Sequence, residues 1–229
     1  MTRPSVGTLA IVCACVSAPR VTAQSAPTVP PPARFEVGIG PVWIGHTNVG
    51  TRDATETAAA GSRFVLFSTS TQLDAAVGIE GRIGIHVSRV LEVDVAASYS
   101  PPMLRSRITA DVENANPTSA GVAVRQIAIG GSLVVHLTRL HVSRRVVPFI
   151  EAGAGYLRQL YDTRTVAATG QTYQIGGGVN YMLASRTGHR VTGLGLRADV
   201  RALARTKGVA PDGRAHVAPA AGASLFVGF

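Results

Sequence analysis

Apolar residues alternate with polar or small residues at every second position in eight separate segments of the chain. In the third segment Leu91, Val93 and Val95 alternate with Glu92 and Asp94. Successive side chains of a β-strand point to opposite faces, so each segment predicts a strand with one apolar and one polar face. The segments are residues 35–43, 73–86, 91–99, 126–137, 148–156, 173–183, 194–201 and 221–229.

The connections between these segments are alternately long and short. We expect long loops at residues 47–70, 101–120, 162–170 and 206–216, and short turns at residues 88–90, 138–145 and 185–190. Short turns on one rim and longer loops on the other are typical of up-and-down barrels of the bacterial outer membrane. An even number of strands places both ends of the barrel on the periplasmic rim.

Composition favours a membrane protein built from strands. The mean hydropathy is +0.23, only 15% of residues are charged, and Lys207 is the single lysine of the chain. No stretch of the sequence approaches the roughly 20 consecutive apolar residues that a membrane-spanning helix needs. The 25 glycines argue against a helical bundle, and the apolar content argues against disorder.

The first 23 residues have the pattern of a secretory signal peptide. Arg3 precedes an apolar run over residues 6–18, and cleavage is expected after Ala23. Residues 24–33, rich in proline and alanine, then predict a disordered leader before a barrel domain at residues 34–229. Both cysteines lie within the signal, so the mature chain forms no disulfide; a lipid anchor on Cys15 is the alternative.

The alternation alone does not say which strand face lies inside. A soluble lipocalin-like barrel that carries an apolar ligand would have the opposite orientation to a membrane barrel. The charged face carries both signs and many glycines, as a narrow interior requires, and aromatic residues near the long-loop ends of the apolar face predict a girdle at the membrane surface. The girdle residues are Trp43, Tyr99, Tyr156 and Tyr173, and Phe35, Tyr181 and Phe229 lie near the opposite ends.

Residues 34–229 resemble the small eight-stranded outer-membrane β-barrels, namely the OmpA-like transmembrane domain and its OmpX-like relatives. The resemblance rests on the alternation, on the segment Pro148–Tyr156 and on the terminal Phe229. It implies an all-β fold, an eight-stranded antiparallel up-and-down transmembrane barrel in the bacterial outer membrane. It also implies a monomer that presents Phe229 as an assembly signal to the barrel-assembly machinery.

The polar face predicts an ion-pair network in the barrel interior, because eight strands enclose a lumen that side chains just fill. Arg82 and Asp94 are expected within one pleat of each other across the second hairpin. The network residues are Glu80, Arg82, Glu92, Asp94, Glu151, Arg197, Asp199 and Arg201, and the same face also carries Glu36 and Asp74.

Two arginines depart from the pattern on the apolar face. Arg125 and Arg158 occupy positions whose side chains point to the apolar face, near the outer ends of the fourth and fifth segments. A hairpin symmetric about its turn would place them directly opposite each other, which is unfavourable unless an anion lies between them. Since arginine binds phosphate well, we expect contact with a lipopolysaccharide phosphate; side chains that extend above the membrane are the alternative.

The catalytic candidates are two pairs, His86 with Ser88 and His141 with Ser143, whose spacing is similar to that of lipid A deacylase barrels. Both pairs fall at periplasmic turns, away from an outer-leaflet substrate, so we expect no enzyme. The sequence shows no cofactor motif, no metal-ligand spacing and no aromatic and basic patch for nucleic acid.

The sequence therefore predicts a structural or surface-interaction protein in contact with the lipid bilayer and lipopolysaccharide. Its extracellular loops would bind a host or envelope protein, or would serve only as connections. A narrow non-specific pore is the main alternative. A lipid A-modifying enzyme and a soluble lipocalin-like carrier are less favoured.

Overall fold

The computed structural model describes residues 34–57, 61–109, 118–140, 143, 145–161, 167–185, 191–208 and 214–229. The expected signal peptide and leader lie outside these residues. The described residues contain no helix with the length and apolar character needed to cross a membrane. Their strands are β1 (Phe35–Ile44), β2 (Thr47–Thr57), β3 (Arg63–Leu73), β4 (Ala76–His86), β5 (Leu91–Ser100), β6 (Met103–Thr109), β7 (Thr118–His136), β8 (Val146–Tyr161), β9 (Ala167–Ser185), β10 (Gly193–Lys207) and β11 (Ala215–Gly228).

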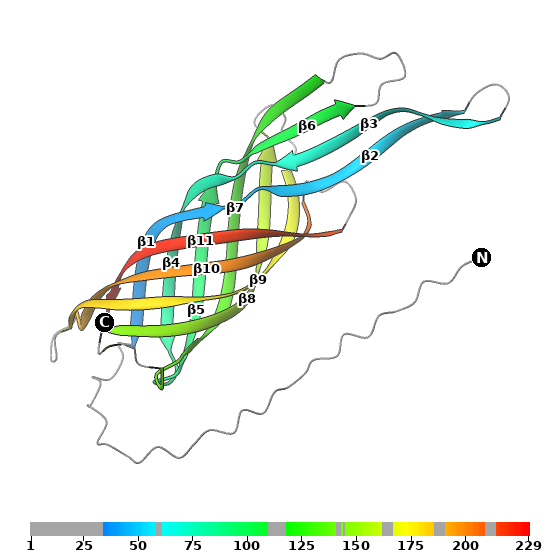
Figure 1. Ribbon diagram of the computed structural model, residues 1–229. Coiled ribbons are helices and arrows are strands. Elements are labelled where there is room, and N and C mark those ends of the chain that lie inside the picture. Colours follow the sequence, from blue (N-terminus) through cyan, green and yellow to red (C-terminus); the bar gives the residue numbers. More distant parts are fainter. Residues whose placement is uncertain are drawn as a thin grey trace, which may run out of the picture.

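Eight of these strands close into an antiparallel ring (Figure 1). Around the ring the order is β1, β4, β5, β7, β8, β9, β10 and β11, and β11 pairs with β1. Each strand therefore neighbours the next ring strand along the chain, which confirms the predicted up-and-down barrel. Closure leaves no ring strand with an unpaired edge, a condition that lipid imposes because it offers the backbone no hydrogen bonds.

A second sheet extends from the barrel and contains β2, β3, β6 and the first residues of β7, in that order. We call it the projecting sheet. Residues 118–123 of β7 pair with β6, whereas the rest of β7 pairs with β5 and β8. Figure 1 shows β2, β3 and β6 reaching beyond the barrel, away from the C-terminus.

The expectation of long loops at residues 47–70 and 101–120 is wrong for the described residues, most of which lie in strands. Of the two other expected loops, residues 206–216 contain strand residues at both ends, and residues 162–170 contain them from residue 167 onward. The sequence did not predict the projecting sheet, because its strands do not alternate apolar with polar residues. Residues 51–56, for example, read Thr-Arg-Asp-Ala-Thr-Glu. A sheet with water on both faces does not require that alternation.

Short breaks separate the barrel from the projecting sheet at one level. They lie at residues 45–46, 74–75 and 101–102. The Gly45 amide donates to the Pro219 carbonyl at 2.8 Å, and the Asp74 amide donates to the Met103 carbonyl at 2.8 Å. Pro101 and Pro102 fill the third break, where proline has no amide hydrogen to donate. The barrel wall thus ends at these breaks, and the projecting sheet is a separate layer beyond them.

The outward face of the barrel is apolar and the inward face is charged. Ile175 and Val200 are 68% and 66% exposed, whereas Glu92 and Arg197 are each 1% exposed. Monomeric soluble proteins rarely expose a continuous apolar belt, whereas such a belt suits a hydrocarbon environment. This orientation is the reverse of a lipocalin-like carrier, so that alternative does not hold.

Inside the barrel, Gly178 provides the space for the ring of Phe149. The two residues pair directly across β8 and β9. A Cβ atom on Gly178 would collide with the Ala198 carbonyl and lie 2.8 Å from Phe149 Cζ. Gly81 is different, because a Cβ atom there would meet nothing within 4 Å.

We predict that Gly178→Val reduces the fraction of protein that folds into a closed barrel. Overpacking of this kind costs about 1–3 kcal/mol. The measurement is gel mobility of the membrane-fraction protein, unboiled and boiled, because closed barrels resist detergent unfolding until heated. Gly81→Val is the matched control and should keep the full heat-dependent shift. A wild-type protein without any shift would contradict the closed barrel.

Candidate functional site

The interior network is built from residues on the inward faces of β4, β5, β8 and β10. Arg82 Nη2 on β4 bonds to Asp94 Oδ2 on β5, and both side chains are almost completely buried. Their strands pair so that Gly84, not Arg82, lies opposite Asp94. The arginine therefore reaches its partner diagonally, one pleat away, as the sequence predicts.

Arg197 is the central residue of the network, and its side chain is 0% exposed. Its Nη2 atom lies 2.6 Å from Glu151 Oε2, and its Nη1 atom lies 3.8 Å from Asp94 Oδ2. The guanidinium also lies 3.9 Å from the centre of the Phe149 ring, in the cation–π arrangement. Since β10 and β5 are not neighbours in the ring, the contact between Arg197 and Asp94 crosses the lumen.

Arg201 makes a second crossing, nearer the outer end of β10. Its Nη2 atom lies 3.0 Å from Glu80 Oε1 on β4, and its Nε atom lies 2.8 Å from Asp199 Oδ2. Arg201 Nε is also 3.7 Å from Glu151 Oε1, which joins this group to the pairs of Arg197. Arg82, Arg197 and Arg201 and their acidic partners thus form one continuous chain of charges that fills the lumen.

Three of the acidic residues expected in the interior do not belong to this chain of charges. Asp74 is at a strand break, where its Oδ2 atom lies 2.6 Å from Arg105 Nε, outside the lumen. Glu36 on β1 is 5% exposed, and its Oε1 atom has no hydrogen-bond partner. Glu92 faces two histidines instead of an arginine: His136 Nε2 at 2.7 Å and His86 Nε2 at 3.6 Å.

The group of His86, Glu92 and His136 was missed by sequence reasoning. Glu92 and His136 are 44 positions apart, and only the pairing of β5 with β7 brings them together. The two imidazole rings stack with their centres 5.3 Å apart and an angle of 17° between their planes. The alternation places all three side chains on the inward faces of three adjacent strands, and this was the signal available in the sequence.

The catalytic pairs considered above make other contacts. Ser88 Oγ accepts hydrogen bonds from the Val90 and Leu91 amides and so caps the turn after β4, whereas His86 faces Glu92. Ser143 Oγ accepts a hydrogen bond from the Arg145 amide. The partner expected for Ser143, at position 141, lies outside the described residues.

Arg125 and Arg158 both lie on the outward face, but they are not directly opposite. Arg125 pairs with Leu160, and Arg158 pairs with Ile127. The expected register is wrong by two positions, because the centre of the β7–β8 hairpin lies one residue later than a symmetric turn would place it. A shift of two keeps every side chain on its face, so the two arginines become diagonal neighbours.

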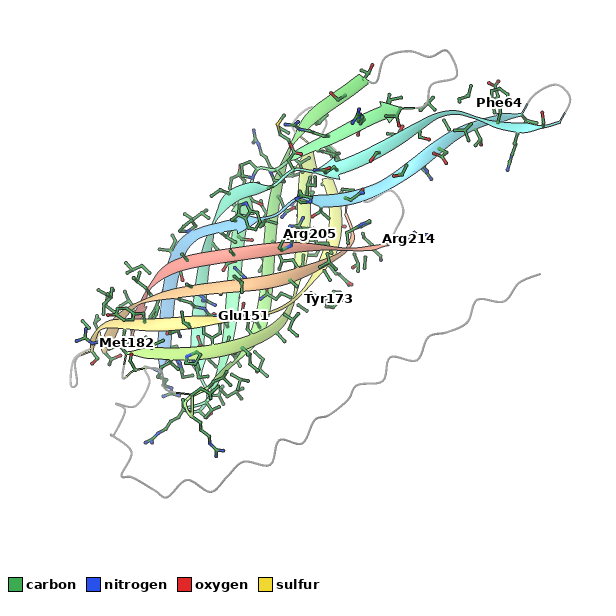
Figure 2. The ribbon with its side chains drawn as sticks, in the orientation of Figure 1. Phe64, Glu151, Tyr173, Met182, Arg205 and Arg214 are labelled. Carbon is green, nitrogen blue, oxygen red and sulfur yellow. The ribbon has the colours of Figure 1, made fainter. Side chains whose placement is uncertain are left out.

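The aromatic residues of the expected girdle all point away from the barrel axis. Each is about half exposed: Trp43 43%, Tyr99 43%, Tyr156 52% and Tyr173 46%. Figure 2 shows Tyr173 on the outer surface of the barrel. At the opposite end the Phe229 amide donates to the Phe35 carbonyl at 2.8 Å. The role of Phe229 as an assembly signal stays a prediction.

A pocket at the outer end of the lumen is the second feature that the sequence did not reveal. Arg205 in this pocket is 6% exposed, and its Nε atom has no hydrogen-bond partner. The pocket draws its walls from five strands, which explains why no local motif marks it. Its lining residues are Thr47, Val49, Leu73, Leu157, Gln159, Arg205, Lys207 and His216.

We predict that Arg197→Gln destabilises the barrel by about 3–5 kcal/mol, the usual cost of removing one partner of a buried ion pair. The measurement is the urea midpoint of unfolding in detergent micelles. Arg89→Gln, in the exposed turn after β4, is the control and should change stability by no more than about 0.5 kcal/mol. A double variant that also carries Glu151→Gln should recover part of the loss. An unchanged midpoint for Arg197→Gln would contradict its central position.

Comparison with solved structures finds several similar chains. The structure of Neisserial surface protein A is 15% identical, with a TM-score of 0.50 over 86% of this chain and 98% of that chain. OprG from Pseudomonas aeruginosa is 10% identical, with a TM-score of 0.47 over 86% of this chain and 96% of that chain. Ail, the attachment invasion locus protein of Yersinia pestis, in complex with the heparin analogue sucrose octasulfate, is 9% identical, with a TM-score of 0.40 over 84% and 99%.

No protein-family model matches the chain, and no curated protein matches it. The likeness to Neisserial surface protein A therefore bears on the fold, and it agrees with the closed ring and the apolar outward belt described above. The chain has the fold of a small eight-stranded β-barrel, and a closed barrel with an apolar outward belt is typical of proteins that span the bacterial outer membrane.

Proposed function

We propose that the protein is a non-enzymatic surface-interaction protein whose projecting sheet contacts a partner outside the cell. The observation that carries this proposal is the sheet itself, which extends the barrel strands beyond the aromatic girdle on the rim opposite the short turns. Phe64 and Val65 in β3 are 40% and 43% exposed, and Met103 and Ile108 in β6 are 44% and 39% exposed. Figure 2 shows Phe64 near the tip of this sheet, far from Glu151 in the barrel. Exposed apolar residues at the end of a polar support are suited to contact a partner.

The chemistry at the base of the projecting sheet favours an anionic partner. The pocket there contains Arg205, Lys207 and His216, and the lining residues from β2 and β3 are uncharged. On the projecting sheet, β6 adds Arg107, whereas Arg105 on the same strand pairs with Asp74. Basic side chains around a concave surface attract anionic groups such as sulfates, phosphates and carboxylates.

The filled lumen argues against the pore alternative. Arg197 and Arg201 on β10 reach acidic partners on β5 and β4 across the interior. An ion passing through the barrel would have to separate these buried pairs, which costs several kcal/mol for each pair. The filled interior therefore favours a barrel that anchors the projecting sheet over a barrel that conducts ions.

We predict that bacteria displaying the protein adhere to a heparin-coated surface, and that a variant which combines an Asn-Gly turn in place of residues 50–70 with Arg107→Gln, Arg205→Gln and Lys207→Gln loses this adhesion. The replaced residues pair mainly with one another and with β6, so the barrel should still fold and show its heat-dependent gel shift. Cells with an empty vector give the background, and an uncharged dextran surface tests the preference for anions.

The control variant replaces residues 209–213 with a Gly-Ser segment of equal length, which alters another expected extracellular loop and leaves β2 and β3 intact. It should adhere like the wild type. Adhesion that survives removal of the β2–β3 hairpin would contradict the role of the projecting sheet. Equal adhesion to dextran and heparin would contradict an anionic partner.

We also propose that Arg125 and Arg158 bind a lipopolysaccharide phosphate. Arg158, Ile127 and Tyr99 lie at one level across β8, β7 and β5, so Arg158 stands at the girdle and Arg125 two residues beyond it. Lipid phosphates lie at this level of a membrane. Diagonal neighbours in a sheet are about 7–8 Å apart, which allows two long side chains to converge on one phosphate group.

We predict that the double variant Arg125→Gln, Arg158→Gln binds lipopolysaccharide up to about 30-fold more weakly, since each charge contributes up to about 1 kcal/mol. The measurement is lipopolysaccharide retained per folded protein after extraction in mild detergent. The control removes two charges from the opposite rim, Arg89 and Arg139, and should retain the wild-type amount. Unchanged retention in the Arg125 and Arg158 variant would refute the contact.

A further inference from the structure

The periplasmic end of the lumen contains three side chains with metal-binding atoms in close proximity. His86 lies at the end of β4, Glu92 at the start of β5 and His136 at the end of β7. One ligand atom from each lies within 4.8 Å of the other two. Both histidines approach the same carboxylate oxygen, Glu92 Oε2, at 3.6 and 2.7 Å.

These distances match a small metal ion after minor adjustment. Metal–ligand bonds of about 2.0–2.1 Å at tetrahedral angles place neighbouring donor atoms about 3.3 Å apart. The two distances to Glu92 Oε2 lie on either side of this value. The third distance, between the two histidine donor atoms, is within 4.8 Å, so the His86 and His136 rings would rotate to bring all three donor atoms to this spacing.

Hydrogen bonding within the group leaves one imidazole unsatisfied. His136 Nε2 and Glu92 Oε2 form one hydrogen bond. His86 Nδ1 is buried and has no hydrogen-bond partner. An ion bound by His86 Nε2 would not contact this Nδ1 atom, and the two Nε2 atoms that approach Glu92 Oε2 are the ones available to a metal.

The charges around the group suit a divalent cation. Glu36 on β1 is buried near β4, opposite Gly84, and its Oε1 atom has no hydrogen-bond partner. Glu92 is the acidic group next to the two histidines, and a cation bound to it would pair with its charge, which is otherwise expensive to bury.

We propose that His86, Glu92 and His136 bind a zinc ion at the periplasmic end of the barrel. Two imidazoles and a carboxylate form a ligand set that zinc favours, and zinc needs no other protein ligand when water completes its coordination. The ion would link β4, β5 and β7 next to the turn at residues 87–90. The site lies next to the short turns, and His86 is the most exposed of the three side chains at 9%.

The test is equilibrium dialysis of untagged, folded protein in detergent micelles, stripped of metal with EDTA and then exposed to zinc chloride. We expect one zinc ion per chain and a higher temperature for loss of the folded gel band, because a ligand that binds only the folded state stabilises it. Cobalt chloride should give visible absorption bands typical of a low-symmetry, four-coordinate site.

The double variant His86→Ala, His136→Ala should bind zinc over about 100-fold more weakly, since loss of even an outer partner of a metal ligand costs about 10- to 100-fold. His46→Ala is the matched control, because His46 is exposed at a strand break, and it should bind like the wild type. Glu92→Gln keeps the shape of the side chain and provides a second variant if the double variant does not fold. Zinc binding that persists in the folded variants, or a wild-type chain that takes up no zinc at micromolar concentrations, would overturn the proposal.

Discussion

The requirement that a backbone in lipid satisfies its own hydrogen bonds determines most of this structure. The pairing of β7 with β8 and of β1 with β11 closes the ring, and with closure every strand gains a face toward lipid and a face toward a narrow interior. The interior must then be filled. Gly178 admits the Phe149 ring, and Arg197 lies over that ring while it contacts carboxylates from two other strands. Closure of the ring therefore requires that side chains fill its interior.

The burial of so many charges is tolerable because they are mutually paired. Arg201 contacts acidic groups on β4, β8 and β10, so no single strand contains the whole network. Such groups contribute less to net stability than their number suggests, because removing each charge from water costs about as much as pairing returns. Their larger effect is on specificity, since the pairs that cross the lumen form only when all the strands are in register.

The sequence was sufficient to predict the features that depend on side-chain period. Alternation identified the strands of the ring, their inward and outward faces and the diagonal pair of Arg82 with Asp94. It did not predict the β7–β8 register, which depends on the turn, because a shift by two positions leaves the pattern unchanged. The projecting sheet was missed because its strands do not alternate apolar with polar residues, and the histidine group was missed because three strands contribute to it.

Strand β7 determines how the barrel responds to a force applied to the projecting sheet. It runs without a break from residue 118 in the projecting sheet to residue 136 at the far rim, whereas the other strands entering that sheet are interrupted. Tension on the sheet therefore travels along the β7 backbone. The hydrogen bonds that pair β7 with β5 and β8 resist this tension in shear. They share the load instead of opening one after another. The ring can hold against a pull from outside the cell more firmly than the hairpin tips that receive it.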